Sequence, residues 1–152
     1  MSVSENYDLS GRVAIITGAS SRGIGYGAAC ALAAQGAKVF LVARREELLA
    51  KHVEEIEKAG GEATYLASDV SSEDGCAKAV DACIEKYGRL DIMVLSAGIS
   101  GMYAEDLEGF FDSDDWEEVL NTNLNGVYHM FQHGYPECAK NGVGSIVPIL
   151  SM

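Results

Sequence analysis

The residues best suited to bind a ligand form a glycine-rich turn near the start of the chain. An apolar run, 13–17, leads into Gly18-Ala-Ser-Ser-Arg-Gly-Ile-Gly25, and an alanine-rich segment follows. Glycine has no Cβ, so the backbone can bend tightly there and approach a ligand closely. A helix that begins near Ile24 would also point its unpaired N–H groups and the positive end of its dipole at an anion. The turn therefore predicts a phosphate site, and a dinucleotide is its natural ligand.

Two consecutive arginines, Arg44 and Arg45, follow the second expected strand. An acidic residue about 20 positions beyond the glycines would bind the ribose 2′-hydroxyl of NAD, whereas arginine accommodates the 2′-phosphate of NADP. The alternative is a solvated pair that begins a helix and forms surface ion pairs with Glu46 or Glu47. We predict NADP as the preferred cofactor, with NAD as the second possibility.

Apolar runs alternate with amphipathic segments along the chain. The pattern predicts strands at 12–17, 37–42, 63–67, 90–96 and 144–150, and helices at 24–35, at 46–59 and from an N-cap at Ser72 to about Tyr87. The small residues Gly27, Ala28 and Ala31 would let the first helix lie close to a sheet. Strands alternating with helices indicate an α/β fold, a Rossmann-like doubly wound parallel sheet with the strand order 3-2-1-4-5.

The end of the chain comes directly after the fifth expected strand. We therefore expect residues 1–152 to form one incomplete NAD(P)-binding Rossmann domain, truncated after the fifth strand, which would be left as an open edge. Pro148 lies within this strand, where it removes a hydrogen-bond donor.

A fourth helix is expected to begin at Asp112-Ser-Asp-Asp and to end or kink before Pro136, because proline lacks the N–H that a helix needs. Its apolar residues recur at helical spacing and would face a core or a partner: Trp116, Val119, Leu120, Leu124, Val127, Tyr128 and Phe131. The acidic, glycine-rich segment 98–112 before it predicts a loop over an active-site face.

Composition argues against several classes of function. Of 152 residues 48% are hydrophobic, and 11 Lys and Arg against 23 Asp and Glu give a net charge of −12. This balance disfavours nucleic-acid and anionic-membrane partners. Apolar runs are far shorter than the roughly 20 residues that span a bilayer, and the polar start does not resemble a leader, so we expect a soluble, cytoplasmic protein.

The four cysteines form no Cys-x-x-Cys pair, which predicts no metal site and free, buried thiols.

Several of these residues, taken together and in order, resemble the short-chain dehydrogenase/reductase family. Thr17-Gly18 with Gly23-Ile24-Gly25 resembles its cofactor turn, and Asp69-Val70 resembles the pair that contacts adenine. Ser96-Ala97-Gly98 stands where the family has Asn-Ala-Gly, the segment 123–127 resembles the helix of its catalytic Asn, and 144–151 resembles the strand that delivers its catalytic Ser. The match extends from about Leu9 to Ser151.

The resemblance implies hydride transfer between a nicotinamide and the carbon of a carbonyl or alcohol substrate. Asn123 would hold a helix kink and a water of the proton relay, and Ser151 would hydrogen-bond the substrate oxygen. The expected cofactor contacts are Gly18, Ser20, Ser21, Arg22, Gly23, Ile24, Gly25, Arg44, Arg45, Asp69, Val70, Ser96, Ala97 and Gly98. The family also builds a dimer interface with the fourth helix, which predicts a homo-oligomer.

One element of the family pattern is absent from this sequence. The resemblance implies a Tyr-x-x-x-Lys pair roughly a dozen residues beyond Ser151, and none of the seven tyrosines has a lysine four positions later. A general acid/base group contributes about 10²–10⁴ in rate, so we expect impaired catalysis from the chain as it stands. The alternative is a non-catalytic module that binds a dinucleotide.

The turn also has four residues between Gly18 and Gly23, one more than the family pattern, so Gly23 to Ala28 could instead provide the pyrophosphate contact.

Overall fold

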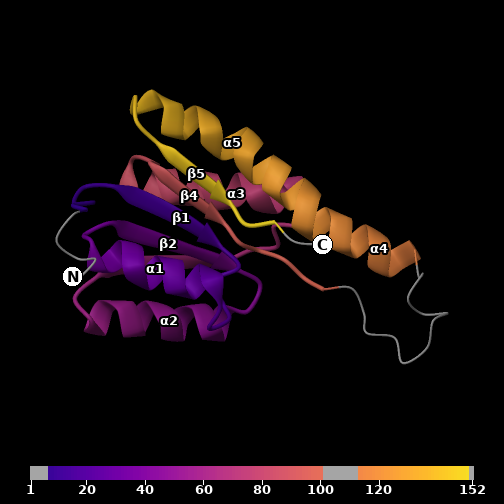
Figure 1. The fold of residues 1–152 in the computed structure, drawn as a ribbon, viewed down its shortest axis with the longest axis horizontal. Helices are drawn as coiled ribbons and strands as arrows, with labels where there is room; N and C mark the ends of the chain where they lie inside the picture. The colour runs from indigo at the N-terminus through magenta and orange to yellow at the C-terminus, as the bar shows by residue number, and fades with distance from the viewer. Residues whose placement is uncertain (1–6, 101–112, 151–152) are drawn as a thin grey trace.

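A computed structural model describes residues 7–100 and 113–150 of the chain, arranged as one sheet between two layers of helices (Figure 1). The sheet has five parallel strands in the order β3-β2-β1-β4-β5, which confirms the predicted fold and strand order. The strands are β1 (Val13–Thr17), β2 (Lys38–Ala43), β3 (Glu62–Ala67), β4 (Ile92–Leu95) and β5 (Ser145–Pro148). Most of the predicted loop at 98–112 and the predicted catalytic Ser151 lie outside the described residues.

The helices cover both faces of the sheet because the central strands are apolar on both sides. Val13 and Ile15 of β1 belong to the core beneath α3 (Glu73–Tyr87) and α5 (Gly126–Lys140), whereas Ala14 and Ile16 belong to the core beneath α1 (Ile24–Ala34) and α2 (Glu46–Lys58). Side chains alternate across a strand, so the continuous apolar run that predicted β1 supplies both cores.

The face of α1 that lies on the sheet differs from the prediction. Gly25, Ala29 and Ala33 are buried, whereas Gly27 and Ala31 are exposed. An alanine-rich helix has almost no hydrophobic pattern from which its buried face can be read. The contact of Gly25 with the carboxyl ends of β1 and β4 sets the rotation of the helix instead.

The predicted fourth helix is three consecutive segments, and it does not end before Pro136. These are α4 (Ser113–Leu120), a π-helical segment η3 (Asn121–Asn125) and α5, which continues through Pro136 to Lys140. Proline deprives the carbonyl of Gln132 of its helical donor. Gln132 and Pro136 are both exposed, where solvent can satisfy that carbonyl, so the helix continues.

Pro148 costs β5 no hydrogen bond to β4. The N–H groups of Ser145 and Ile149 donate to Asp91 and Leu95, respectively, so the odd-numbered residues of this strand donate towards β4. The nitrogen of Pro148 faces the other side, and β5 is the edge of the described sheet, which is where proline is tolerated.

Three of the four cysteines are buried, and all four are free thiols. Burial raises the pKa of Cys76 and of Cys83 to about 12, and that of Cys138 to about 11. The prediction of free, buried thiols is confirmed for these three, whereas Cys30 is only half-buried.

No helix within residues 7–100 and 113–150 has both the length and the apolar character that crossing a membrane requires.

A buried carboxylate, Asp91, joins three strands at the amino-terminal edge of the sheet. It accepts hydrogen bonds from Arg12 (2.9 Å), from Arg89 (2.6 and 2.8 Å) and from the N–H of Val13 (3.0 Å), and its own carbonyl accepts from Ser145 of β5 (2.9 Å). Burial alone would raise the pKa of Asp91, but these hydrogen bonds outweigh it and lower that pKa from its ordinary value. The ionised carboxylate therefore stabilises the fold.

We predict that Asp91→Asn lowers the free energy of unfolding at neutral pH by about 2 kcal/mol, because bonds to a charged acceptor become bonds to a neutral amide. The lowered pKa means that the stabilisation is full above the unfolded value of about 3.9 and is lost as the pH falls through the folded value. Urea titrations at neutral and acidic pH should show the variant and the wild type converging in acid. Asp81→Asn, at an exposed position on α3, is the control. Equal stability of the Asp91 variant and the wild type at neutral pH would contradict the prediction.

Candidate functional site

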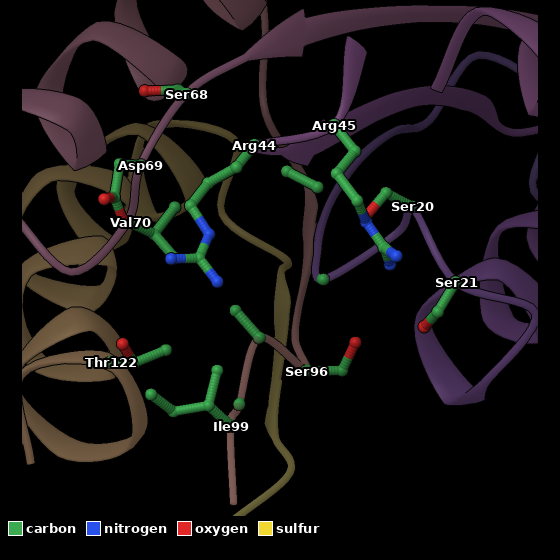
Figure 2. A pocket seen from close by; sticks show the side chains of 14 residues that line it. Ser20, Ser21, Arg44, Arg45, Ser68, Asp69, Val70, Ser96, Ile99 and Thr122 are labelled. Carbon is green, nitrogen blue, oxygen red and sulfur yellow. The ribbon is translucent and has the colours of Figure 1, made fainter. Parts of the chain in front are cut away.

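A cavity of about 250 Å³ lies at the carboxyl ends of the strands, where the segments that follow β1, β2, β3 and β4 meet (Figure 2). In a doubly wound sheet, ligands bind at this edge. The cavity is lined by Gly18, Ser20, Ser21, Ala43, Arg44, Arg45, Ser68, Asp69, Val70, Ser96, Ala97, Gly98, Ile99 and Thr122. The fold therefore brings together ten of the residues that the sequence predicted for a cofactor.

Two of the three glycines in the turn are required by the protein's own packing. Gly18 has φ +69°, and a Cβ there would lie 2.6 Å from the carbonyl oxygen of Ser96. A Cβ at Gly25 would lie 2.6 Å from the Ser96 hydroxyl and 2.9 Å from the carbonyl of Gly18. At Gly18 and Gly25, the absence of a Cβ is therefore needed for the close contact between the turn and the end of β4, and not only for a ligand.

Hydrogen bonds fix this contact between the ends of β1 and β4. The Thr17 hydroxyl oxygen accepts the N–H groups of Ser96 and Ala97, both at 3.1 Å. The Ser96 hydroxyl in turn donates to the Thr17 carbonyl at 2.6 Å. Ser96 stands where the resemblance implies Asn, and it is held by the glycine turn while lining the cavity.

The start of α1 has the properties of an anion site. Gly23 is its N-cap, no side chain caps the helix, and the first turn carries no acidic residue. In α3, by contrast, Ser72 caps the N–H of Gly75, and Glu73 and Asp74 occupy the first turn, which confirms the predicted N-cap there. The N–H groups at the start of α1 thus lack the side-chain partners that α3 has, and a Cβ at Gly23 would meet nothing closer than the Ser21 hydroxyl at 3.4 Å.

The two arginines after β2 have different surroundings. The Nε of Arg45 donates to the Ser20 hydroxyl at 3.1 Å, so this side chain lies against the glycine turn. Figure 2 shows the Arg44 side chain extending into the cavity, towards the side formed by Val70 and Thr122. Within residues 7–100 and 113–150, its one ion pair is a 3.9 Å contact with Glu118 in which both side chains are more than half exposed, and such pairs contribute little.

Asp69 and Val70 reach the cavity from the turn after β3. Asp69 is exposed and accepts the N–H of Ser71 at 3.0 Å, the geometry of a side chain that shapes its own turn. Val70 is buried, and a Cβ on Gly126 would collide with its carbonyl. The start of α5 therefore lies directly against this turn.

Asn123 lies in the π-helical segment η3 and is buried. Its side-chain oxygen accepts the N–H of Ile99 at 2.8 Å, and its side-chain nitrogen donates to the Ile99 carbonyl at 2.9 Å. A π-helical turn inside a long helix is rare and occurs often at functional sites. The amide of Asn123 thus holds the segment after β4 in place, next to Gly98 and Ile99 of the cavity wall.

Four of the predicted cofactor residues lie outside the cavity wall: Arg22, Gly23, Ile24 and Gly25. The Nη2 of Arg22 lies 2.6 Å from a carboxylate oxygen of Glu55, so this arginine contacts α2. Ile24 is exposed on α1. Their role as cofactor contacts stays a prediction.

Several residues near the site were missed by reasoning from sequence. Ser68, Ile99 and Thr122 line the cavity. His52 of α2 is buried behind the turn, with Nδ1 at 2.8 Å from the Ala19 carbonyl oxygen. The burial of His52 could have been predicted from the sequence, because this residue lies three positions after Leu49 and four before Ile56, on the apolar face of α2.

No group of three or more His, Cys, Asp or Glu side chains that could hold a metal ion occurs in the described part of the chain.

A family model described as short chain dehydrogenase matches residues 12–152. The chain belongs to the short-chain dehydrogenase family. It is 37% identical over 141 residues to 7alpha-hydroxysteroid dehydrogenase of Clostridium sardiniense, a match that covers 93% of this chain and 53% of that enzyme. It is 35% identical over 144 residues to versicolorin reductase of Emericella nidulans, covering 93% and 53%. The chain thus spans about half the length of the curated relatives it matches.

Solved structures of similar proteins show the same fold. A metagenomic short-chain oxidoreductase in complex with NADP matches with a TM-score of 0.82 and 36% identity, over 90% of this chain and 61% of that one. An NAD⁺-bound xylitol dehydrogenase matches with a TM-score of 0.83 and 29% identity, over 91% and 52%.

We predict that Gly18→Ala lowers the free energy of unfolding of this short-chain dehydrogenase by at least about 2 kcal/mol, because alanine disfavours positive φ and its Cβ would meet the Ser96 backbone. Gly23→Ala is the matched control, since its φ is negative and its surroundings are open. Urea denaturation measures both, and a Gly18 variant as stable as the Gly23 variant would contradict the packing role.

Proposed function

We propose that this protein is an oxidoreductase that transfers a hydride between a nicotinamide cofactor, preferentially NADP, and the carbon of a carbonyl or alcohol substrate. The observation that carries the proposal is the cavity at the carboxyl edge of the sheet, where the glycine turn and Arg44 and Arg45 come together. Membership in the short-chain dehydrogenase family and the NADP named for a similar solved structure support it.

The residues present suit a dinucleotide. The N–H groups at the start of α1 have no side-chain cap and would hold a diphosphate, and Arg44 and Arg45 would hold a 2′-phosphate. Asp69 and Val70 would contact the adenine. The bound nicotinamide would supply the hydride chemistry, which the protein's own side chains cannot perform. Asn123, through its bonds to Ile99, would hold the wall beside the reacting groups.

Preference for NADP follows from the charge at the end of β2. A guanidinium forms charge-assisted, often bidentate bonds with phosphate. The 3.9 Å exposed contact with Glu118 competes weakly for Arg44. An NAD-specific site would carry an acidic residue at the end of β2, where this chain has Arg44 and Arg45.

We predict that Arg44→Ala weakens NADPH binding about tenfold or more, because a charged hydrogen bond to the 2′-phosphate is lost, and leaves NADH binding nearly unchanged. Calorimetric titration at constant ionic strength measures both dissociation constants. Lys58→Ala removes the same charge from an exposed position at the end of α2 and should change neither. Equal losses for NADPH and NADH in the Arg44 variant would contradict the 2′-phosphate assignment.

Catalysis is tested separately from binding. None of the residues lining the described cavity is a tyrosine or a lysine, so affinity for the cofactor does not by itself establish turnover. NADPH oxidation should be followed with a panel of hydroxysteroid ketones, sugars, acyl thioesters and small ketones. Slow turnover of at least one of them is expected, because the chain as it stands lacks the Tyr-x-x-x-Lys pair. Binding with no turnover for any of them would favour the alternative, a module that binds a dinucleotide without catalysis, and absence of NADPH binding would contradict the cofactor proposal.

We also propose that the protein self-associates through the exposed face of α4, η3 and α5. Four large apolar side chains of this face are about half exposed or more: Leu124, Tyr128, Phe131 and Tyr135. They recur at intervals of four, three and four residues, so they form one stripe. The rings of Phe131 and Tyr135 stack at 5.3 Å. A contiguous exposed apolar patch of this kind marks an interaction surface.

We predict that the wild type sediments as a dimer or larger oligomer and that Leu124→Glu shifts it to the monomer, because a carboxylate would be buried in the interface without a partner. Lys51→Ala changes the net charge by the same one unit at an exposed position on α2 and should leave the oligomer intact. Sedimentation equilibrium provides the measurement. A wild-type monomer at all accessible concentrations would contradict the proposal.

A further inference from the structure

A buried histidine lies directly behind the glycine turn, and the cavity wall does not include it. His52 is 3% exposed and shares the inner face of α2 with Leu49 and Ile56. Its Nδ1 is 2.8 Å from the carbonyl oxygen of Ala19. A carbonyl oxygen can only accept a hydrogen bond, so Nδ1 carries the hydrogen and donates it.

The imidazole is itself held in place from α1. The ring of Tyr26 stacks on it with centroids 3.9 Å apart and planes inclined by 25°. The Tyr26 hydroxyl donates to Glu55 of α2, and the same carboxylate accepts from Arg22, which also lies over the Tyr26 ring. Arg22 within the turn and Tyr26 directly after it are thus tied to Glu55 of α2, and Tyr26 holds the His52 ring in place.

The bond from His52 sets the orientation of one peptide group in the turn. In a trans peptide the C=O and the following N–H point to opposite sides. With the Ala19 carbonyl held towards α2, the N–H of Ser20 is held away from α2. Ser20 lines the cavity, and its hydroxyl accepts from Arg45, so both its backbone and its side chain are fixed.

We propose that His52 is a positioning residue for the diphosphate of the cofactor: by holding the Ala19 carbonyl from behind, it presents the Ser20 N–H to the anion. This inference rests on the proposed function, and it adds a residue of α2 to a site otherwise built from the turns after the strands. A histidine that only fills the core would affect the stability of the fold and not the affinity for one particular part of the ligand.

The test separates the parts of the cofactor. NADPH and ADP contain a diphosphate, whereas 2′-AMP carries the adenosine and the 2′-phosphate without one. His52→Leu should raise the dissociation constants of NADPH and ADP about tenfold, the loss of one well-placed hydrogen bond, and leave that of 2′-AMP within about twofold. His52→Asn should restore ADP binding to within about threefold of the wild type, because its amide nitrogen takes the place of Nδ1. Ile56→Val, a buried change on the same helix face, is the stability-matched control and should alter neither ligand.

The results distinguish this inference from the function on which it rests. A wild-type protein that binds neither NADPH nor ADP overturns both. A wild-type protein that binds them, with a His52→Leu variant that binds ADP equally well or loses ADP and 2′-AMP alike, overturns the positioning role alone. If His52→Leu does not fold, His52→Gln replaces it, because its amide nitrogen lies one bond further out than that of Asn. Equal ADP affinities of the Asn and Gln variants would then overturn the inference.

Discussion

The site depends on the close approach of the turn after β1 to the end of β4. A Cβ on Gly18 would lie 2.6 Å from the Ser96 carbonyl oxygen, and a Cβ on Gly25 would lie 2.6 Å from the Ser96 hydroxyl. The Thr17 hydroxyl accepts the N–H groups of Ser96 and Ala97, which directly follow β4. Because backbone atoms of both segments take part and the Thr17 and Ser96 hydroxyls bond across the contact, the positions of the two turns are closely fixed. The rotation of α1 and the place of its N-terminus follow from it.

The two ends of the sheet perform different tasks. At the amino-terminal edge, the buried carboxylate of Asp91 accepts hydrogen bonds from Arg12, Arg89 and Val13, and this cluster binds the strands together. At the carboxyl edge the polar groups of the turns surround a cavity instead. A buried charge is tolerated only where it is fully paired. The paired charges at the amino-terminal edge therefore stabilise the fold, whereas the exposed arginines at the carboxyl edge are available to bind a ligand.

The arginines near the cavity have different partners, which cannot be inferred from the sequence around each of them. The chain has a net charge of −12, yet three arginines lie around the glycine turn. Arg22 pairs with Glu55, Arg45 donates to Ser20, and Arg44 reaches into the cavity with a weak partner. All three carry the same charge, but their contacts in the folded protein differ.

The sequence by itself determined the α/β class and the position of the glycine turn, because these depend on local patterns: apolar runs, amphipathic helices and small residues at a strand end. The strand order was predicted correctly from the doubly wound topology that this alternation indicates. Ten of the residues that the sequence predicted for a cofactor line one cavity, since turns that follow parallel strands meet at one edge. Only the tertiary structure decided which face of α1 is buried, that the helix continues through Pro136, and that Asn123 lies in a π-helical turn bonded to Ile99. The buried face of α1 and the position of Asn123 depend on contacts between segments distant in the chain, and the passage of the helix through Pro136 depends on the exposure of Gln132 and Pro136 to solvent. The role of His52 is the clearest case, because a histidine among apolar helix residues acquires its meaning only from the Ala19 carbonyl that the fold places 2.8 Å away.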